Sequence, residues 1–216
     1  MIRYRLLLET SSRTPIVALA DDQAVIREVR LEEDRRNARD LVPTIGQLLE
    51  EVGQRPRDLA GILVGLGPGS YTSLRVGLMT AKTLSYAVGC PLIGVPTMPI
   101  LAYQAGEPRV EVIVDAQKDQ LYVQSFADGR PQTTLRILKV AAWLAARDPV
   151  ILVTGPGLSK ISDPSIRRSP QTAWLPSAAA LLAVGSTLAP SDPFSLLPLY
   201  LRPSAAEQQW EARGKL

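Results

Sequence analysis

Two stretches of similar design decide the fold: RLLLETSSRTPIVAL at residues 5–19 and EVIVDAQKDQLYVQSF at residues 111–126. Each pattern is typical of an apolar strand that ends in an acid, followed by a short polar turn and a second apolar strand. Glu9 and Asp115 therefore occupy matching positions at the ends of the first strands. The repeat predicts a chain of two similar halves, each with one carboxylate at a strand end.

The elements around these stretches follow one order in both halves, strand-strand-strand-helix-strand-helix. In the first half we expect further elements at residues 24–30, 40–52, 61–66, 72–88, 91–95 and 97–104. In the second half we expect them at residues 132–136, 139–147, 150–154 and 178–189. This layout resembles the duplicated actin-like ATPase (ribonuclease-H-like) fold, an α/β fold of two similar lobes with one carboxylate per lobe facing a central cleft. Two unrelated meanders in one α/β domain are the alternative at this point.

The length of 216 residues suits two small lobes or one large domain. We expect an N-terminal actin-like lobe at residues 1–106 and a C-terminal actin-like lobe at residues 107–190. The remaining residues, 191–216, are punctuated by proline, so we expect a tail that packs on the body or is partly disordered.

The composition excludes several kinds of catalytic and metal site. The chain has no histidine, and Cys90 is its single cysteine. These counts exclude a Ser-His-Asp triad, a Cys-His pair, a zinc site built from histidine or cysteine, and a disulfide within the chain. A metal held by carboxylates stays possible on this ground alone. We expect no tightly bound metal and no cofactor.

Charge and hydropathy point to a cytoplasmic protein without a membrane span. The 24 basic and 21 acidic residues leave a net charge of +3, and aromatic residues make up 5% of the chain. No clustered aromatic platform for stacking bases is visible, so direct RNA binding by the chain alone is not predicted. The longest weakly polar stretch, residues 178–189, fits a buried helix better than a membrane span.

A glycine-rich loop follows the apolar strand at residues 61–66 and precedes a long helix. Its members are Gly65, Gly67, Pro68, Gly69 and Ser70. Glycines before a helix N-terminus let a phosphate approach the backbone. The spacing, however, is not that of a dinucleotide fingerprint, and no Lys-Ser/Thr pair closes a Walker A loop. We interpret the loop as a tight turn that lets strand and helix pack closely.

Glu9 and Asp115 form a possible vestigial cleft. Paired acids of this kind could hold a cation together with nucleotide phosphates, which makes a stand-alone actin-fold ATP-dependent phosphotransferase the alternative function. Neither turn after these acids contains a glycine for close phosphate approach. The sequence therefore predicts weak ATP binding or none.

Small and apolar residues recur at helical spacing on the two long helices of the first half. Small residues allow another helix to approach closely, either within the chain or between chains. We predict a two-helix face offered to a partner, formed by Leu41, Ile45, Leu48, Leu74, Gly77, Leu78, Ala81 and Ser85.

The run GLGPGSYTSLRVGLMTAKTL at residues 65–84 resembles the GxGPGSFTGLRxGLxxAKGL signature of the TsaB (YeaZ) family. Pro91–Thr97 resembles the family's P-x-I-G-V-x-T stretch, and Pro198–Arg202 resembles its closing P-x-Y-L-R. The resemblance covers residues 4 to 202 in family order. Ser73 and Thr83 replace two of the glycines that the family usually has.

The resemblance implies a non-catalytic subunit of the bacterial complex that makes threonylcarbamoyladenosine next to the tRNA anticodon. Its expected partners are a TsaD-like catalytic subunit and a TsaE-like ATPase, with tRNA bound only through the complex and a homodimer formed when the chain is alone. The catalytic sister carries two metal-binding histidines on the helix that matches residues 97–104. Thr97 and Leu101 stand at those positions here, and neither side chain can hold such a metal. The resemblance therefore implies no catalytic residue, metal or cofactor in this chain.

Overall fold

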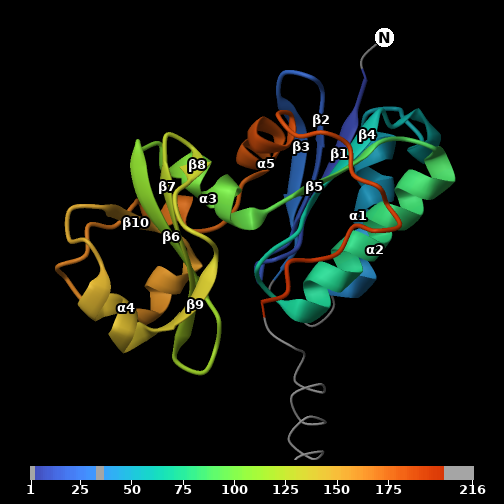
Figure 1. Cartoon of the computed structure of the whole chain (residues 1–216). Coiled ribbons are helices and arrows are strands. Elements are labelled where there is room, and N and C mark those ends of the chain that lie inside the picture. Colours follow the sequence, from blue (N-terminus) through green and yellow to red (C-terminus); the bar gives the residue numbers. More distant parts are fainter. Residues whose placement is uncertain (1–2, 33–36, 202–216) are drawn as a thin grey trace, which may run out of the picture.

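The structure, a computed structural model, describes residues 3–32 and 37–201 of the chain. Within these residues, two five-stranded sheets lie side by side, one in each lobe (Figure 1). The first sheet has the order β3-β2-β1-β4-β5, and the second has the order β10-β6-β7-β8 with β9 also paired to β7. The acid-ended strands β1 and β6 therefore sit at corresponding places, each beside an antiparallel hairpin partner and a parallel strand.

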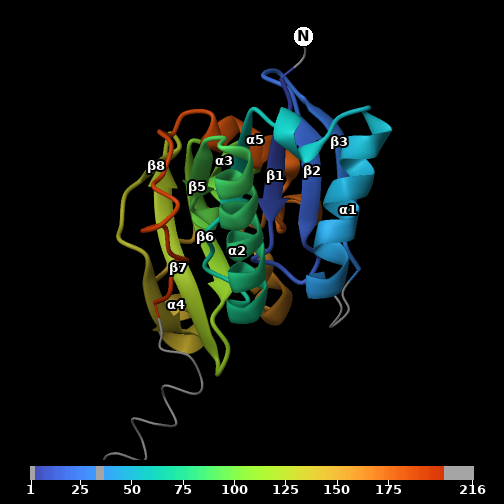
Figure 2. The same cartoon turned by 90° about the vertical axis from the view of Figure 1, so that its right-hand side faces the viewer.

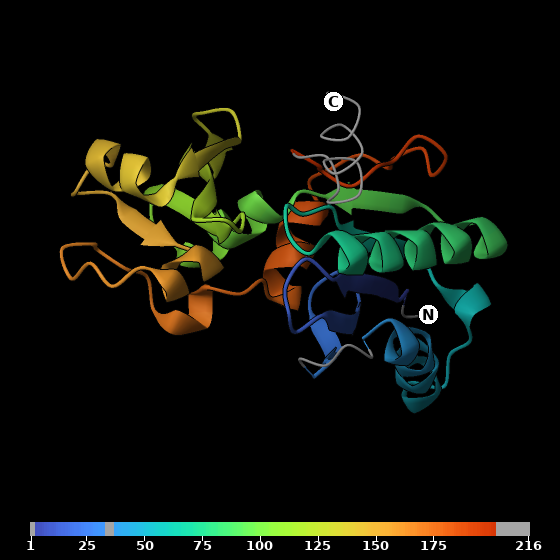
Figure 3. The same ribbon diagram turned by 90° about the horizontal axis from the view of Figure 1, so that it is seen from below.

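The first sheet is buried on both faces. Its strands are β1 (Arg5–Glu9), β2 (Ile16–Ala20), β3 (Val25–Arg30), β4 (Gly61–Gly65) and β5 (Leu92–Val95). Helices α1 (Asn37–Glu51) and α2 (Tyr71–Val88) cover one face, and α5 (Ala178–Gly185) covers the other (Figure 3). Helices on both faces explain why every residue of β2 and β4 is buried and apolar or small.

The second sheet is covered by one helix on each face. Its strands are β6 (Arg109–Asp115), β7 (Gln120–Ala127), β8 (Arg130–Pro131), β9 (Arg136–Lys139) and β10 (Leu152–Thr154). Helix α3 (Thr97–Ala105) packs on one face. On the other face, the buried Trp143 of α4 (Val140–Ala146) packs with residues from the short 3₁₀ helix η2 (Pro156–Lys160) and the segment after it.

The two lobes exchange a helix. The expected lobe ranges, 1–106 and 107–190, contain one sheet each, but α3 packs on the second sheet and α5 packs on the first. Helices α3 and α5 also contact each other. Gln104 of α3 joins them further, because its amide donates to the carbonyls of Ala173 and Leu175 and accepts the amide of Ser177.

Two predicted elements are placed differently in the structure. The third strand of the second half was expected at residues 132–136, and β9 lies at Arg136–Lys139 instead. The backbone is diverted there because the Thr133 hydroxyl accepts the Ser125 amide at 3.0 Å, so a side chain takes the place of a ladder carbonyl. The last helix ends at Gly185 rather than near residue 189. Just after this end, the Thr187 hydroxyl donates to the carbonyl of Val184.

The C-terminal strap, residues 191–201, runs along the edge of the first sheet beside α2 (Figure 2). Ser191 pairs with Leu92 of the edge strand β5, and Leu196 packs into the core above Gly94. The Leu199 amide donates to the carbonyl of Leu66 at 2.9 Å. This part of the predicted tail packs on the body, and residues 202–216 lie outside the described residues. No helix in the described part of the chain is long and apolar enough to cross a membrane.

Candidate functional site

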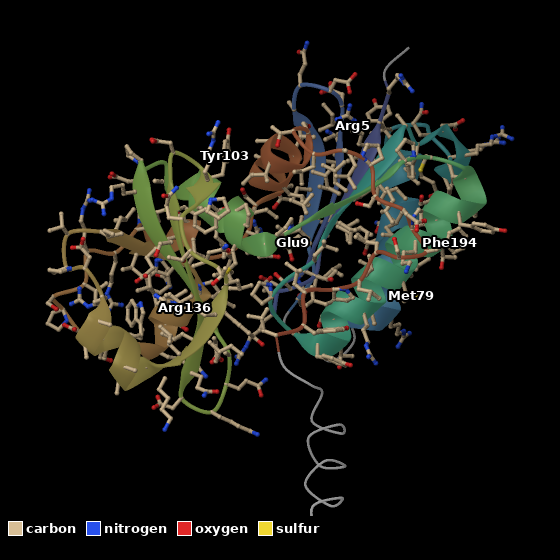
Figure 4. The ribbon with its side chains drawn as sticks, in the orientation of Figure 1. Arg5, Glu9, Met79, Tyr103, Arg136 and Phe194 are labelled. Atoms are coloured by element: carbon tan, nitrogen blue, oxygen red, sulfur yellow. The ribbon has the colours of Figure 1, made fainter. Side chains whose placement is uncertain are left out.

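Glu9 ends β1 in the middle of the molecule, close to the start of α3 (Figure 4). Its carboxylate is fully buried. Oε1 accepts the Ser11 amide at 2.7 Å, and Oε2 accepts the Thr97 hydroxyl at 3.0 Å. Burial raises the pKa of Glu9 above its ordinary value, and the hydrogen bonds from Ser11 and Thr97 oppose that rise. Glu9 thus links the turn after β1 to the first residue of α3 and does not face solvent as a free ligand.

The glycine loop packs directly over this carboxylate. A Cβ at Gly65 would overlap the Glu9 carboxylate, and one at Gly69 would overlap the Ser11 carbonyl oxygen. The Gly67 amide donates to the Thr97 hydroxyl at 3.1 Å, and the Ser70 amide donates to the Ser11 carbonyl at 2.9 Å. Glycine is required here because backbone and carboxylate approach so closely. The structure gives the loop a packing role, with two of its amides already used.

Thr97 has a role that the sequence does not show. Thr97 is the first residue of α3, and Pro96 is the N-cap of that helix. The Thr97 hydroxyl joins Glu9 to Gly67, and its amide donates to the Gly67 carbonyl at 2.9 Å. A contact between residues 88 positions apart leaves no local signal in the sequence.

Asp115 ends β6 in a different environment. Its side chain is 27% exposed, and it forms an ion pair with the Lys160 ammonium at 2.7 Å. It also accepts the Gln117 amide at 2.8 Å, which ties the carboxylate to the turn that follows it. Lys160 is the last residue of η2, and that helix begins within Gly155-Pro156-Gly157, a second glycine-proline turn, which lies against the acid-ended strand. The acid of the second lobe is therefore neutralised by a cation from its own lobe.

These contacts leave neither acid ready to hold a cation for nucleotide phosphates. Leu101, which the resemblance places with Thr97 at the expected histidine positions, is fully buried in the core between α3 and the second sheet. Among the residues that the structure describes, no three histidine, cysteine or acidic side chains gather as a metal site. The groups around Glu9 donate hydrogen bonds to it, among them the Ser11 amide and the Thr97 hydroxyl, and donors of this kind suit a buried carboxyl rather than a metal ion.

The eight residues predicted to face a partner are buried inside the chain, which corrects that choice of residues. They share the faces of α1 and α2 that pack on the first sheet or on each other: Leu41, Ile45, Leu48, Leu74, Gly77, Leu78, Ala81 and Ser85. A Cβ added at Gly77 would overlap the side chain of Thr10 in the same chain, so this position faces the interior. The stripe of small residues serves helix-on-sheet packing.

The outward faces of the same helices carry a different set of residues. Val42 of α1 and Met79 of α2 are each 58% exposed. One turn further along, Thr83 is exposed, and a Cβ at Gly46 would meet no atom within 4 Å. Exposed aliphatic side chains beside positions with open space form a surface that another helix could approach closely.

The two helices also differ in charge. Described charged residues of α1 are Arg39, Asp40, Glu50 and Glu51, whereas α2 contains Arg75 and Lys82 and no acid. An acidic helix beside a basic helix is complementary to a partner that brings the same pair in the opposite order.

Known proteins resemble this chain in sequence over most of its length. The family model described as TsaD, tRNA N6-adenosine threonylcarbamoyltransferase, matches residues 25–149, more than half of the chain. The tRNA threonylcarbamoyladenosine biosynthesis protein TsaB of Bacillus subtilis (strain 168) is 29% identical over 95% of this chain and 96% of that protein. The protein of the same name from Escherichia coli (strain K12) is 30% identical over 54% of this chain and 52% of its own length.

Solved structures share the fold. YeaZ from Pseudomonas aeruginosa matches with a TM-score of 0.77 at 23% identity, over 93% of this chain and 100% of that chain. A protein described as similar to peptidase YEAZ, also from Pseudomonas aeruginosa, gives the same TM-score at 24% identity. Four strands have the same order in both lobes, β3-β2-β1-β4 in the first and β9-β7-β6-β10 in the second, and together with this likeness they confirm the predicted duplicated actin-like fold.

Proposed function

The chain belongs to the tRNA N6-adenosine threonylcarbamoyltransferase family and, within it, to the TsaB (YeaZ) group, and we propose that it serves in tRNA threonylcarbamoyladenosine biosynthesis as a scaffold. In this role it pairs with a TsaD-like catalytic subunit and has no catalytic activity of its own. A TsaE-like ATPase joins the same complex, and tRNA is contacted only through it. We expect the complex to act in the cytoplasm.

One observation carries the non-catalytic part of the proposal: both strand-end acids are already engaged. Glu9 is buried under the glycine loop, and Asp115 is paired with Lys160. To hold a cation with nucleotide phosphates, the first acid would have to leave its amide and hydroxyl donors, and the second would have to leave its ammonium. The geometry therefore does not favour the stand-alone phosphotransferase as an alternative.

The outward faces of α1 and α2 are the surface proposed for pairing. A partner of the same fold brings an equivalent helix pair, so the contact is a four-helix arrangement in which like surfaces meet. In this arrangement the acidic α1 faces the partner's basic helix, and the basic α2 faces the partner's acidic helix. An interface of the ordinary size buries about 1,600 Å² in total. Without the catalytic subunit, the same surface supports a homodimer.

Gly46→Arg tests this pairing without disturbing the fold. The new side chain enters open space, and arginine has a higher helix propensity than glycine by up to about 1 kcal/mol. It also blocks close approach of a partner helix. Ala145→Arg, on the exposed face of α4 in the second lobe, is the matched control.

Sedimentation of each variant mixed with the TsaD-like subunit of the same organism measures the pairing. We expect wild type and Ala145→Arg to form the complex and Gly46→Arg to remain free while showing a native circular dichroism spectrum. Complex formation by Gly46→Arg with unchanged affinity would place the interface elsewhere. Substrate-stimulated ATP turnover by the isolated chain would instead support the phosphotransferase.

A further inference from the structure

Large apolar side chains gather on α2 and the strap, next to the helix surface that includes Met79. Tyr86 of α2 is 76% exposed and Phe194 of the strap is 79% exposed. Met79 and Leu197 are also exposed. Figure 4 labels Met79 and Phe194 along the same outer side of the first lobe. Tyr86, Phe194 and Leu197, which continue this surface beyond Met79, are called the apolar ridge.

The strap is fixed along α2 in the antiparallel direction by contacts at three levels. The Phe194 ring meets the Tyr86 ring edge-on, with centroids 6.1 Å apart. One turn back along α2, the Lys82 ammonium donates to the Leu196 carbonyl at 3.1 Å. At the start of α2, the Tyr200 ring stacks on Tyr71 with centroids 4.4 Å apart.

Local turns hold Phe194 in its exposed position. The Asp192 carboxylate accepts the amide of Phe194 at 3.1 Å and the amide of Ser195 at 3.2 Å. Leu196, two residues after Phe194, is anchored in the core. An aromatic ring kept in water by a rigid turn loses little conformational entropy when a partner covers it, and this is typical of interface hot spots.

We propose that the apolar ridge is a second contact surface for the TsaD-like subunit, so that the strap and the helix pair dock on one partner together. The inference rests on the proposed function, because it assigns the ridge to the partner that α1 and α2 bind. The partner's matching surface is an apolar socket that receives the Tyr86 and Phe194 rings.

Continuity and area favour this occupant. The strap, α2 and α1 lie side by side on one side of the molecule, so a partner seated on the helices reaches the strap (Figure 2). The outward apolar side chains of the helix pair are few, chiefly Val42 and Met79. The Tyr86 and Phe194 rings add on the order of 300 Å² of exposed surface, a substantial share of the roughly 800 Å² that each partner of a stable pair buries.

The test measures the affinity of full-length variants for the TsaD-like subunit by calorimetry. The double variant Tyr86→Ser, Phe194→Ser removes both rings. Tyr103→Ser is the matched control, because Tyr103 is an exposed aromatic residue at a distance from the ridge (Figure 4). We expect the double variant to bind at least about tenfold more weakly and the control to bind within about twofold of wild type.

The outcomes separate this inference from the proposed function. Normal binding by the double variant, together with loss of binding by Gly46→Arg, overturns the ridge contact and leaves the helix-pair scaffold standing. Weak binding by the double variant with normal binding by Gly46→Arg supports the ridge contact and overturns the helix pair. Normal binding by both variants overturns both.

Two further results would give the ridge another role and so overturn the inference. If the double variant loses only self-association and keeps its affinity for the TsaD-like subunit, the ridge belongs to a second copy of this chain. Loss of the ring pair alone accounts for a fall of at most about 6 °C in Tm. A larger fall in the isolated chain would mean that the two rings stabilise the fold of this chain itself, which would also overturn the inference.

Discussion

Each lobe places an acid at the end of the corresponding strand, but the two acids have different surroundings. In the first lobe, Glu9 is buried beneath the glycine loop and accepts hydrogen bonds from Ser11 and Thr97. In the second lobe, Asp115 stays partly exposed and pairs with Lys160. One acid is isolated from charge and the other is neutralised by it, so each is engaged by a different physical means.

The different surroundings of Glu9 and Asp115 show that the same fold can place an acid in different chemical environments. A glycine-proline turn follows the parallel strand in both lobes, and in both a glycine lies against the backbone or carboxylate of the acid-ended strand. The same framework therefore surrounds two acids whose contacts differ. A scaffold needs only the framework and its outer surfaces.

The largest effect is expected for Gly77→Arg in the first lobe. We expect loss of the folded state, because even a Cβ at this position overlaps Thr10 next to Glu9, and α2 would have to leave the sheet. Overpacking of a tight core costs about 1–3 kcal/mol or more, and an arginine also buries a charge. Circular dichroism and sedimentation measure the outcome.

Gly46→Arg on α1 is the control for this change, since it adds the same side chain in open space. A folded Gly77→Arg chain that fails to pair with a partner would restore the interface that the sequence predicted at this position.

Glu9→Gln should change how stability depends on pH. Burial raises the pKa of Glu9, so the folded chain keeps a proton that the unfolded chain loses. The stability from this group is complete below the unfolded pKa and is lost as the pH rises through the folded pKa, by up to about 1.4 kcal/mol per pH unit. The glutamine variant lacks this loss and should gain on wild type as the pH rises.

Urea unfolding of both proteins at several pH values between 4 and 8 measures the difference. Parallel stability curves for wild type and Glu9→Gln would contradict the account of a buried acid without a compensating cation.

Asp115→Asn should have a small effect of the opposite sign. The ion pair with Lys160 is partly exposed on both sides, and such pairs contribute about 0–1 kcal/mol. We expect a loss of that size at low salt that shrinks as salt is added. A loss of several kcal/mol in the free energy of unfolding, independent of salt, would contradict this expectation. It would show that the second lobe depends on Asp115 for its stability.

Magnesium-ATP should show the smallest effect of all. With Glu9 and Asp115 both engaged, we expect an affinity of about 1 mM or weaker for the isolated chain. Calorimetry with Lys160→Ala, which frees Asp115 alone, should give the same result. Micromolar binding by either protein would mean that the two acids can still act together.

The sequence predicted the paired halves well because strand ends, turns and acids are local signals. The matching positions of Glu9 and Asp115 follow from two short runs of residues, and the structure places both at the ends of corresponding strands. The small residues Gly77, Ala81 and Ser85 were ambiguous, since the same spacing serves a helix against its own sheet and a helix against a partner. Only the fold shows that the sheet takes that face.

The sequence does not predict the role of Thr97 or the apolar ridge, for a different reason. Both depend on contacts between distant segments, Thr97 with Glu9 and Phe194 with Tyr86. The strap also lacks regular structure, so its exposed side chains follow neither a helical nor a strand period. Long-range contacts of irregular segments become visible only when the chain is folded.

Reconstituted tRNA modification tests the central claim most directly. The wild-type chain, the double variant Glu9→Gln, Asp115→Asn and the surface variant Gly46→Arg are each combined with the TsaD-like and TsaE-like subunits, and threonylcarbamoyl transfer to tRNA is measured. The account predicts a rate within about twofold of wild type for the double variant and a loss of at least about tenfold for Gly46→Arg. A folded double variant that assembles normally but no longer supports transfer would contradict it.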